Sequence, residues 1–201
     1  MSREPPLWLA GYSGAPKQGR VYRAVVTITD AEMAALLAPA GILFLRRLRS
    51  NEEPPRLLPP YVSPAGALPE HGRIDSPAID IDDPDLAAEV RETWFWMATE
   101  YELLDDDREF LLGVDYADPE DVDREWAWAR VRLLDEWDLG GGDDGPLPMW
   151  MRFYMGERFV PEFTVMALDG RMMMNTTLWG DGTVSTIVIR PASDKRPDVL
   201  R

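Results

Sequence analysis

Two clusters of carboxylates are the residues in this 201-residue chain whose type and spacing could bind a metal ion. Four aspartates fall within residues 80–85, and Asp105, Asp106 and Asp107 are contiguous. A hard cation such as Ca²⁺ takes about six to eight oxygen ligands from a sharply turning loop. Neither cluster has the glycine and the distal glutamate of a calcium-binding loop. We therefore interpret both clusters as helix caps and solvated surface, and we predict no metal site.

Carboxylates among aromatic residues could also act as the acid and base of glycoside hydrolysis, with tryptophan rings as platforms for the sugar. Glu92, Glu100 and Glu102 lie among aromatic residues, and Glu162 lies in a segment with the pattern of a strand. The distance between two carboxylates defines that chemistry, and the sequence does not contain it. We assign no catalytic residue and no cofactor, and we favour a role other than catalysis.

Other residues that commonly carry chemistry are scarce. The chain has no cysteine, which excludes thiolate nucleophiles, disulfides and cysteine metal sites. Its single histidine, His71, has no second histidine with which to share a metal ion and lies in a proline-rich stretch. The glycines at 140–142 are not followed by the Lys-Ser/Thr pair of a phosphate-binding loop.

Tryptophan is the second conspicuous residue type. Trp94, Trp126 and Trp137 follow helical periods with other apolar residues, which is typical of a core. Trp96 and Trp128 stand beside those periods, so the core explains them least well. Large amphipathic rings are favoured anchors of protein interfaces. We therefore treat Trp96 and Trp128 as candidate binding residues.

Negative charge is concentrated in the middle of the chain. Residues 75–144 hold 24 of the 36 acidic residues and 5 of the 21 basic ones, a formal charge of −19 within a total of −15. Direct binding of nucleic acid is a poor expectation, because that affinity comes from lysines and arginines that neutralise phosphates. The sequence has no long apolar run and no signal-peptide core, so we expect no membrane contact and a cytoplasmic location.

Hydrophobic periodicity predicts the elements that position these residues. A β-branched run predicts a strand over 21–29, and the capping box of Thr29 and Glu32 predicts a short helix after it. Residues 42–48 predict a second strand or buried segment. Residues 52–77 contain seven prolines and predict a long loop, with a proline-rich recognition ligand as the less favoured interpretation.

Two main helices are predicted within the acidic block. Asp83-Pro84-Asp85 and Asp118-Pro119-Glu120 are helix starts, and residues 105–107 could cap a further short helix over 110–112 that ends at Gly113. The first helical stripe comprises Leu86, Val90, Trp94, Met97, Tyr101 and Leu104. The second comprises Val122, Trp126, Ala129, Leu133 and Trp137. We interpret the pair as a helical hairpin rather than a repeat, because the residues after the two starts do not match.

The last third of the chain changes to the two-residue period of strands after a flexible break at 140–146. Strands are predicted around 149–155, 163–167, 172–176 and 183–189, with hairpin turns at Asp169-Gly170 and Gly180-Asp181-Gly182. Residues 191–201 form a polar tail. The predicted fold is a single α+β domain, in which a C-terminal antiparallel meander joined by N-terminal strands carries two acidic, tryptophan-rich helices on one face.

The main functional hypothesis is an acidic module that docks on a basic protein partner. Immunity proteins, inhibitors of basic nucleases and mimics of nucleic acid carry negative charge in this way, and we compare the chain with them by analogy only. The alternative is an enzyme or small-molecule-binding protein with an apolar pocket between sheet and helices, near Trp94, Met155 and Met174. A structural subunit of a homo-oligomer is the third possibility. The predicted partner-binding residues are Trp96, Asp105, Asp106, Asp107, Glu120, Asp121 and Trp128.

Overall fold

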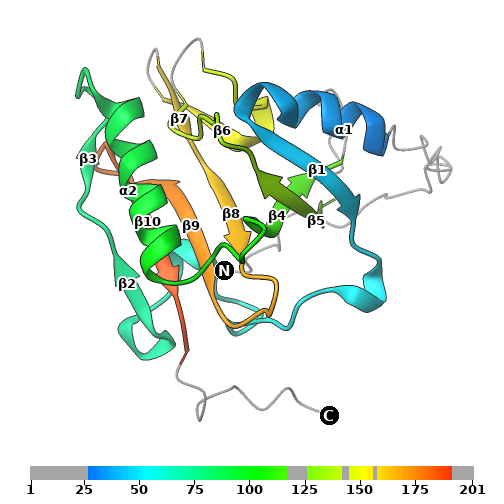
Figure 1. Ribbon diagram of the computed structural model, residues 1–201. Coiled ribbons are helices and arrows are strands. Elements are labelled where there is room, and N and C mark those ends of the chain that lie inside the picture. Colours follow the sequence, from blue (N-terminus) through cyan, green and yellow to red (C-terminus); the bar gives the residue numbers. More distant parts are fainter. Residues whose placement is uncertain (1–26, 117–125, 142–144, 156–157, 192–201) are drawn as a thin grey trace, which may run out of the picture.

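The computed structural model describes residues 27–116, 126–141, 145–155 and 158–191. Within these ranges the fold is α+β: an antiparallel eight-stranded sheet with the order β1-β5-β4-β8-β9-β10-β2, in which β3 also pairs with β10 (Figure 1). A separate hairpin is formed by β6 and β7. The large antiparallel sheet and the α+β class confirm the coarse prediction. The described strands are β1 (Ile42–Arg47), β2 (Arg73–Asp75), β3 (Ile79–Asp80), β4 (Glu109–Asp115), β5 (Trp126–Leu133), β6 (Arg152–Met155), β7 (Arg158–Pro161), β8 (Phe163–Met166), β9 (Met173–Leu178) and β10 (Thr183–Ile189).

The first helix, α1 (Asp30–Leu37), begins with the predicted capping box. The Thr29 hydroxyl accepts from the Glu32 N–H at 3.3 Å, and the Glu32 carboxylate accepts from the Thr29 N–H at 2.8 Å. A 3₁₀ turn over Ala38–Ala40 ends at Gly41, whose φ of +71° suits a residue without a side chain. The chain then enters β1, which confirms the predicted strand. The predicted strand over 21–29 lies almost wholly outside the described residues.

The helix predicted after Asp83-Pro84-Asp85 is present as α2 (Leu86–Glu100). Its apolar stripe faces the sheet, because Leu86, Val90, Trp94 and Met97 are buried. The helix begins two residues later than a proline at the first helical position would place it. The carboxylate of Asp83 accepts from the N–H of Asp85 in a local turn rather than capping the helix.

The prediction of a second helix in the acidic block is wrong for the described residues, because 126–133 form β5 and pair with β4 along its whole length. Ala127, Ala129, Val131 and Leu133 face one side of the sheet and alternate with larger residues on the other. The spacing of Trp126, Ala129 and Leu133 fits a helix, but the two-residue alternation prevails once β4 supplies a partner. Residues 117–125, with the predicted start at Asp118, lie outside the described ranges.

The predicted short helix over 110–112 is also wrong. Residues 105–107 form a turn in which the Asp105 carboxylate accepts from the N–H groups of Asp107 at 3.0 Å and Glu109 at 2.7 Å. Phe110 and its neighbours belong to β4, and Gly113 lies within that strand rather than ending a helix. Asp105 therefore caps a turn that leads into a strand.

The C-terminal meander is confirmed for three of the four predicted strands. The pairs β8–β9 and β9–β10 are antiparallel neighbours joined by the turns at Asp169-Gly170 and Gly180-Asp181-Gly182. The first predicted strand is different: Met149–Met151 form a 3₁₀ turn, and β6 pairs with β7 away from the main sheet. The tail beyond 191 lies outside the described residues.

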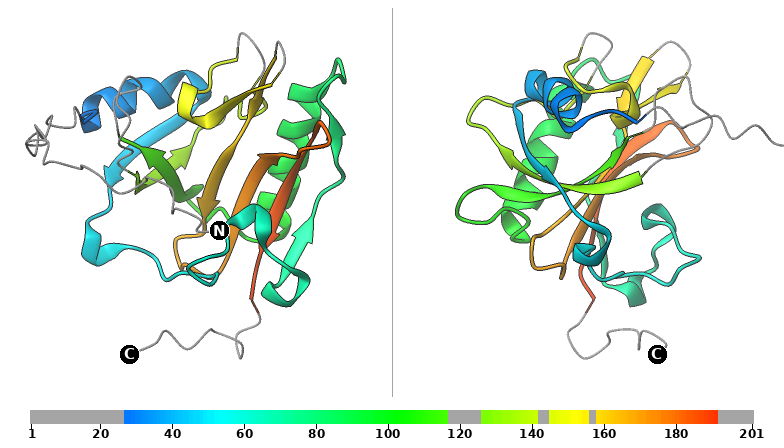
Figure 2. Two further views of the ribbon diagram at one scale, coloured as in Figure 1. Left: turned by 180° about the vertical axis from the view of Figure 1, so that it is seen from behind. Right: turned by 90° about the vertical axis from the view of Figure 1, so that its right-hand side faces the viewer.

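The sheet has two unlike sides. On the helical side, α1 and α2 cover the largest core cluster, which includes Phe110, Leu112 and Val131. On the opposite side, the segment 52–68 covers a smaller cluster that includes Leu111, and α2 and this segment flank β9 and β10 from opposite sides (Figure 2). That segment is the first part of the predicted proline-rich loop 52–77, and 3₁₀ turns lie at Ser50–Glu52, Pro64–Gly66 and Pro69–His71. The predicted loop also contains β2, which pairs with β10 at the sheet edge. No described helix combines the length and apolarity needed to cross a bilayer.

Candidate functional site

The solvent face of α2 is a line of carboxylates around one tryptophan. Glu89, Glu92, Trp96 and Glu100 are all exposed and recur at intervals of three and four, so they share one stripe of the helix. The Trp96 side chain is 53% exposed at the centre of that stripe. Five apolar residues on the other side of the helix are buried, so the core does not use Trp96. The stripe is the strongest candidate for a protein-binding surface.

Trp96 stands on a rigid base. Its neighbour Phe95 packs on Trp137 with ring centroids 5.4 Å apart, and Trp137 packs on the buried Trp94 at 5.7 Å. Trp94 also lies 6.1 Å from the ring of Phe110 in β4. These ring contacts join α2 to the sheet, so the backbone that presents Trp96 is held in place.

The acidic turn at 105–107 follows α2 after the short connection 101–104. All three aspartates are exposed, and Arg108 beside them forms an ion pair with Asp135 at 2.9 Å. We name the α2 stripe and this turn together the acidic surface, defined by Glu89, Glu92, Trp96, Glu100, Asp105, Asp106 and Asp107.

The predicted binding residues do not all meet on this surface. Trp96 and the three aspartates belong to it, whereas Trp128 lies in β5 on the opposite side of the sheet, half-buried against the smaller core cluster. Glu120 and Asp121 lie outside the described residues. The structure places Trp96 on α2 and the three aspartates in the exposed turn that follows it in the chain, and it separates Trp128 from Trp96 by the sheet.

The alternative hypothesis predicts an apolar pocket between the sheet and the helices, near Trp94, Met155 and Met174. Met155 instead ends β6, in the hairpin that is separate from the main sheet. Trp94, Met97 and Met174 have no exposed surface and belong to one continuous core cluster. Trp94 contacts Phe163 of β8 with ring centroids 6.3 Å apart. These side chains pack on one another where the pocket was expected.

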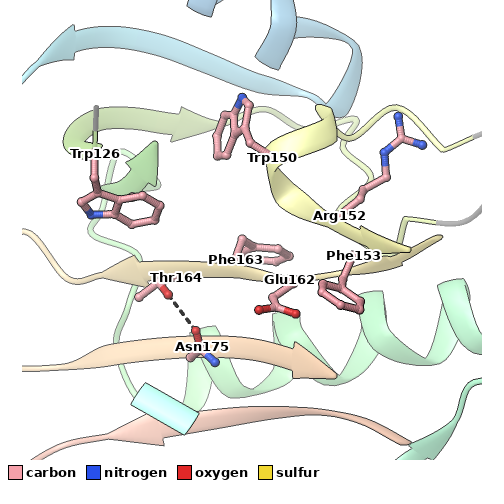
Figure 3. A pocket seen from close by; sticks show the side chains of 9 residues that line it. Trp126, Trp150, Arg152, Phe153, Glu162, Phe163, Thr164 and Asn175 are labelled. Carbon is pink, nitrogen blue, oxygen red and sulfur yellow. Dashed lines mark hydrogen bonds between the residues drawn. The ribbon is translucent and has the colours of Figure 1, made fainter. Parts of the chain in front are cut away.

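A pocket of about 170 Å³ lies elsewhere, at the end of β8 beside the β6–β7 hairpin (Figure 3). Four aromatic rings line it: Trp126 from β5, Trp150 from the 3₁₀ turn, Phe153 from β6 and Phe163 from β8. Gly113 in β4 makes room for Trp126, because a β-carbon at Gly113 would overlap the indole. Trp126 pairs with Asp115 in the register and reaches Gly113 diagonally, so the contact depends on the pairing of β4 with β5, which the predicted helix excluded.

Polar side chains complete the pocket. Asn175 of β9 is only 7% exposed, and its side-chain oxygen accepts from the Thr164 hydroxyl at 2.7 Å. Glu162 directs its carboxylate towards Asn175 (Figure 3). Arg152 turns its guanidinium over the ring of Phe159, 5.2 Å from the centroid. The pocket thus combines flat apolar rings with hydrogen-bonding groups.

A third polar feature is an ion cluster on the side of the sheet that faces away from α1 and α2. Glu109 is 4% exposed, and its carboxylate accepts from Arg130 and from Arg132, each at 2.6 Å. The hydrogen bond from Arg132 is the largest effect that lowers the pKa of Glu109 below its ordinary value, opposed by burial. The carboxylate pairs with both guanidinium groups within the cluster, so we interpret it as structural.

The remaining carboxylates considered for catalysis are not assembled into a site. Glu92, Glu100 and Glu102 are exposed on and after α2, while Glu162 lies at the pocket. Within the described ranges, no three acidic or histidine side chains come close enough to share a metal ion. His71 ends a 3₁₀ turn, where its Nδ1 accepts from the Leu68 N–H at 2.9 Å.

No known protein family, no curated protein and no solved structure matches this chain.

Proposed function

We propose that this chain is an acidic protein-binding module that docks on a basic protein partner through the acidic surface. The observation that carries the proposal is Trp96, which is half-exposed at the centre of a line of carboxylates on a firmly packed helix. Exposing an indole in water has a free-energy cost that docking against a partner recovers.

The charges around Trp96 fit the same role. Glu92 and Glu100 lie four residues before and after it, so each is its neighbour on the helix surface. Carboxylates in this position steer a cationic partner during encounter and add less to the final affinity than the buried ring does. Tryptophan would therefore govern how long the complex lasts, and the carboxylates how quickly it forms.

The class of partner follows from the charge. A protein that binds nucleic acid presents a basic surface, and an acidic module that occupies this surface blocks or escorts its partner. Immunity proteins, nuclease inhibitors and mimics of nucleic acid are the analogous classes. The absence of cysteine from all 201 residues fits a reducing compartment, and action in the cytoplasm is part of the proposal.

Capture from a lysate of the native host at about 50 and 500 mM NaCl identifies the partner, because surface charge is largely screened at the higher concentration. Binding kinetics are then measured with the purified partner. Trp96→Ala is expected to speed dissociation and weaken affinity about 30-fold, the scale of an interface hot spot. Glu92→Lys with Glu100→Lys is expected to slow association about 10-fold at low salt.

The matched control reverses two exposed carboxylates away from the acidic surface, Glu53→Lys with Asp169→Lys, which change the net charge equally. Association should then slow less than threefold, because distant charges act only through the screened overall field. An affinity that is indifferent to salt, to Trp96 and to the location of the reversed charges would reject docking through this surface.

A further inference from the structure

The pocket at Trp126 lies on the opposite side of the sheet from α2, so the proposed docking does not use it. We propose that this pocket binds one polyhydroxylated six-membered ring, that is, a single saccharide unit. The inference is independent of the proposed function, because none of its residues belongs to the acidic surface.

Size limits the ligand to one ring. An apolar cavity of roughly 150 Å³ holds a benzene-sized molecule, and this pocket has about 170 Å³. It is open on one side, so further units of a longer chain would extend into solvent.

The aromatic rings supply the flat surfaces that a sugar requires. Trp126 is 50% exposed and Phe153 is 49% exposed, and they stand on opposite sides of the pocket (Figure 3). The π face of an aromatic ring carries partial negative charge, and the C–H bonds on one face of a pyranose ring are weakly positive. Because Gly113 has no side chain, the Trp126 indole packs directly on β4. Its ring is therefore oriented before the ligand arrives.

The polar groups distinguish a sugar from a cation, the other ligand that aromatic cages bind. The Asn175 oxygen is occupied by the Thr164 hydroxyl, which leaves its amide N–H groups as the donors at the pocket. The Glu162 carboxylate lies beside them and, with one interaction already made within the chain, still has further lone pairs that can accept. Each sugar hydroxyl both donates and accepts, which matches this pair. An ammonium ion has no acceptor for the amide N–H groups, so it would leave these donors unpaired.

The lining also indicates binding without hydrolysis. Glycoside hydrolysis ordinarily requires two carboxylates about 5 to 10 Å apart across the bond that breaks. Glu162 is the one carboxylate among the described residues that line the pocket. The described lining therefore supports recognition of a saccharide rather than its hydrolysis.

The test is a titration of the full chain with the methyl glycosides of glucose, galactose, mannose and N-acetylglucosamine, followed by calorimetry and by the NMR signals of the indole N–H groups. Tetramethylammonium chloride is titrated in parallel as the cation. At least one glycoside is expected to saturate the site with a millimolar Kd, in the range of a one-ring ligand. Trp126→Ala should abolish this binding, and Trp126→Phe should retain it within about fivefold because the flat ring remains.

Asn175→Asp separates the two ligand classes. It keeps the acceptor for Thr164, replaces the amide donors with an oxygen and adds a negative charge. Saccharide binding should weaken at least tenfold, whereas binding of a cation would strengthen. Should this buried substitution unfold the protein, the exposed Trp126 variants decide the question alone.

Trp96→Ala is the matched control, an exposed tryptophan of similar accessibility on α2, and should leave glycoside binding unchanged. The proposal is overturned if no glycoside saturates at about 50 mM, if tetramethylammonium binds in their place, or if Trp126→Ala leaves the affinity intact. Partner docking can succeed or fail independently, because it is tested through Trp96.

Discussion

The two sides of the sheet bury different kinds of side chain. On the helical side, the buried polar residues of β9 and β10 are Thr176 and Thr186, which hydrogen-bond to each other at 3.0 Å within an apolar core. On the opposite side, β4 and β9 bury Glu109 and Asn175. Contacts between apolar side chains do not depend on a specific orientation, whereas a buried charge or amide requires hydrogen-bond partners in specific positions.

We infer that one side of the sheet mainly stabilises the fold and the other mainly binds a ligand. The helical side is sealed by α1 and α2, and what it offers to a partner is the outer surface of α2. The opposite side is only partly covered by the segment 52–68, so hollows remain between the side chains that line it. The large core therefore holds the fold together, while the partly covered side keeps polar groups accessible to a ligand.

The largest expected effect compares one tryptophan from each side. Trp94→Ala removes a fully buried side chain from the helical core and should cost about 4 kcal/mol of unfolding free energy. Trp128→Ala removes a half-buried ring on the opposite side and should cost about half as much. Urea unfolding of both variants measures the difference. Equal losses would mean that the two sides contribute alike to stability.

The middle effect concerns the ion cluster. Glu109→Gln replaces a buried carboxylate with an amide that cannot accept from both Arg130 and Arg132 as strongly, and it should cost about 2 kcal/mol at neutral pH. A larger loss is not expected, because both arginine side chains are about 40% exposed and water can solvate them. Glu53→Gln, at an exposed site, is the control and should change stability by less than about 0.5 kcal/mol.

The pH dependence of this effect has a definite sign. The pKa of Glu109 is lower in the folded chain than its ordinary value near 4.5, so the folded state favours the ionised form. The stabilisation is complete above that ordinary pKa and is lost as the pH falls through the lowered pKa of the folded state. The stability gap between wild type and Glu109→Gln should therefore be full at pH 7 and narrow below pH 4.5. A constant gap down to pH 2 would contradict a stabilising role for the ionised carboxylate.

The smallest effect tests a local feature of the helical side. Thr29→Ala removes the side-chain cap of α1 and should cost about 1 kcal/mol. The glycoside affinity at Trp126 should be unchanged, because α1 does not line that pocket. Thermal unfolding and the glycoside titration measure the two outcomes. A weaker glycoside affinity in this variant would show that the two sides are coupled.

Several elements could be predicted from the sequence because the residues that determine each one lie close together in the chain. The capping box of α1 spans four residues, the buried stripe of α2 repeats every three or four, and the turns after β8 and β9 are marked by glycine beside aspartate. Each depends on hydrogen bonds or periods within a few residues. The accumulation of acidic residues in mid-chain and the projection of Trp96 beyond the apolar stripe follow from the sequence in the same way.

Tertiary structure alone decided the rest. Residues 126–133 satisfy a helical and a strand period, and only pairing with β4 and β1 selects the strand. Glu109 is buried by arginines 21 and 23 residues away, and Trp126 rests on Gly113. Sheets bring together residues that are distant in sequence. The burial of these residues, and the pockets between them, therefore depend on strand partners that a local sequence pattern does not predict.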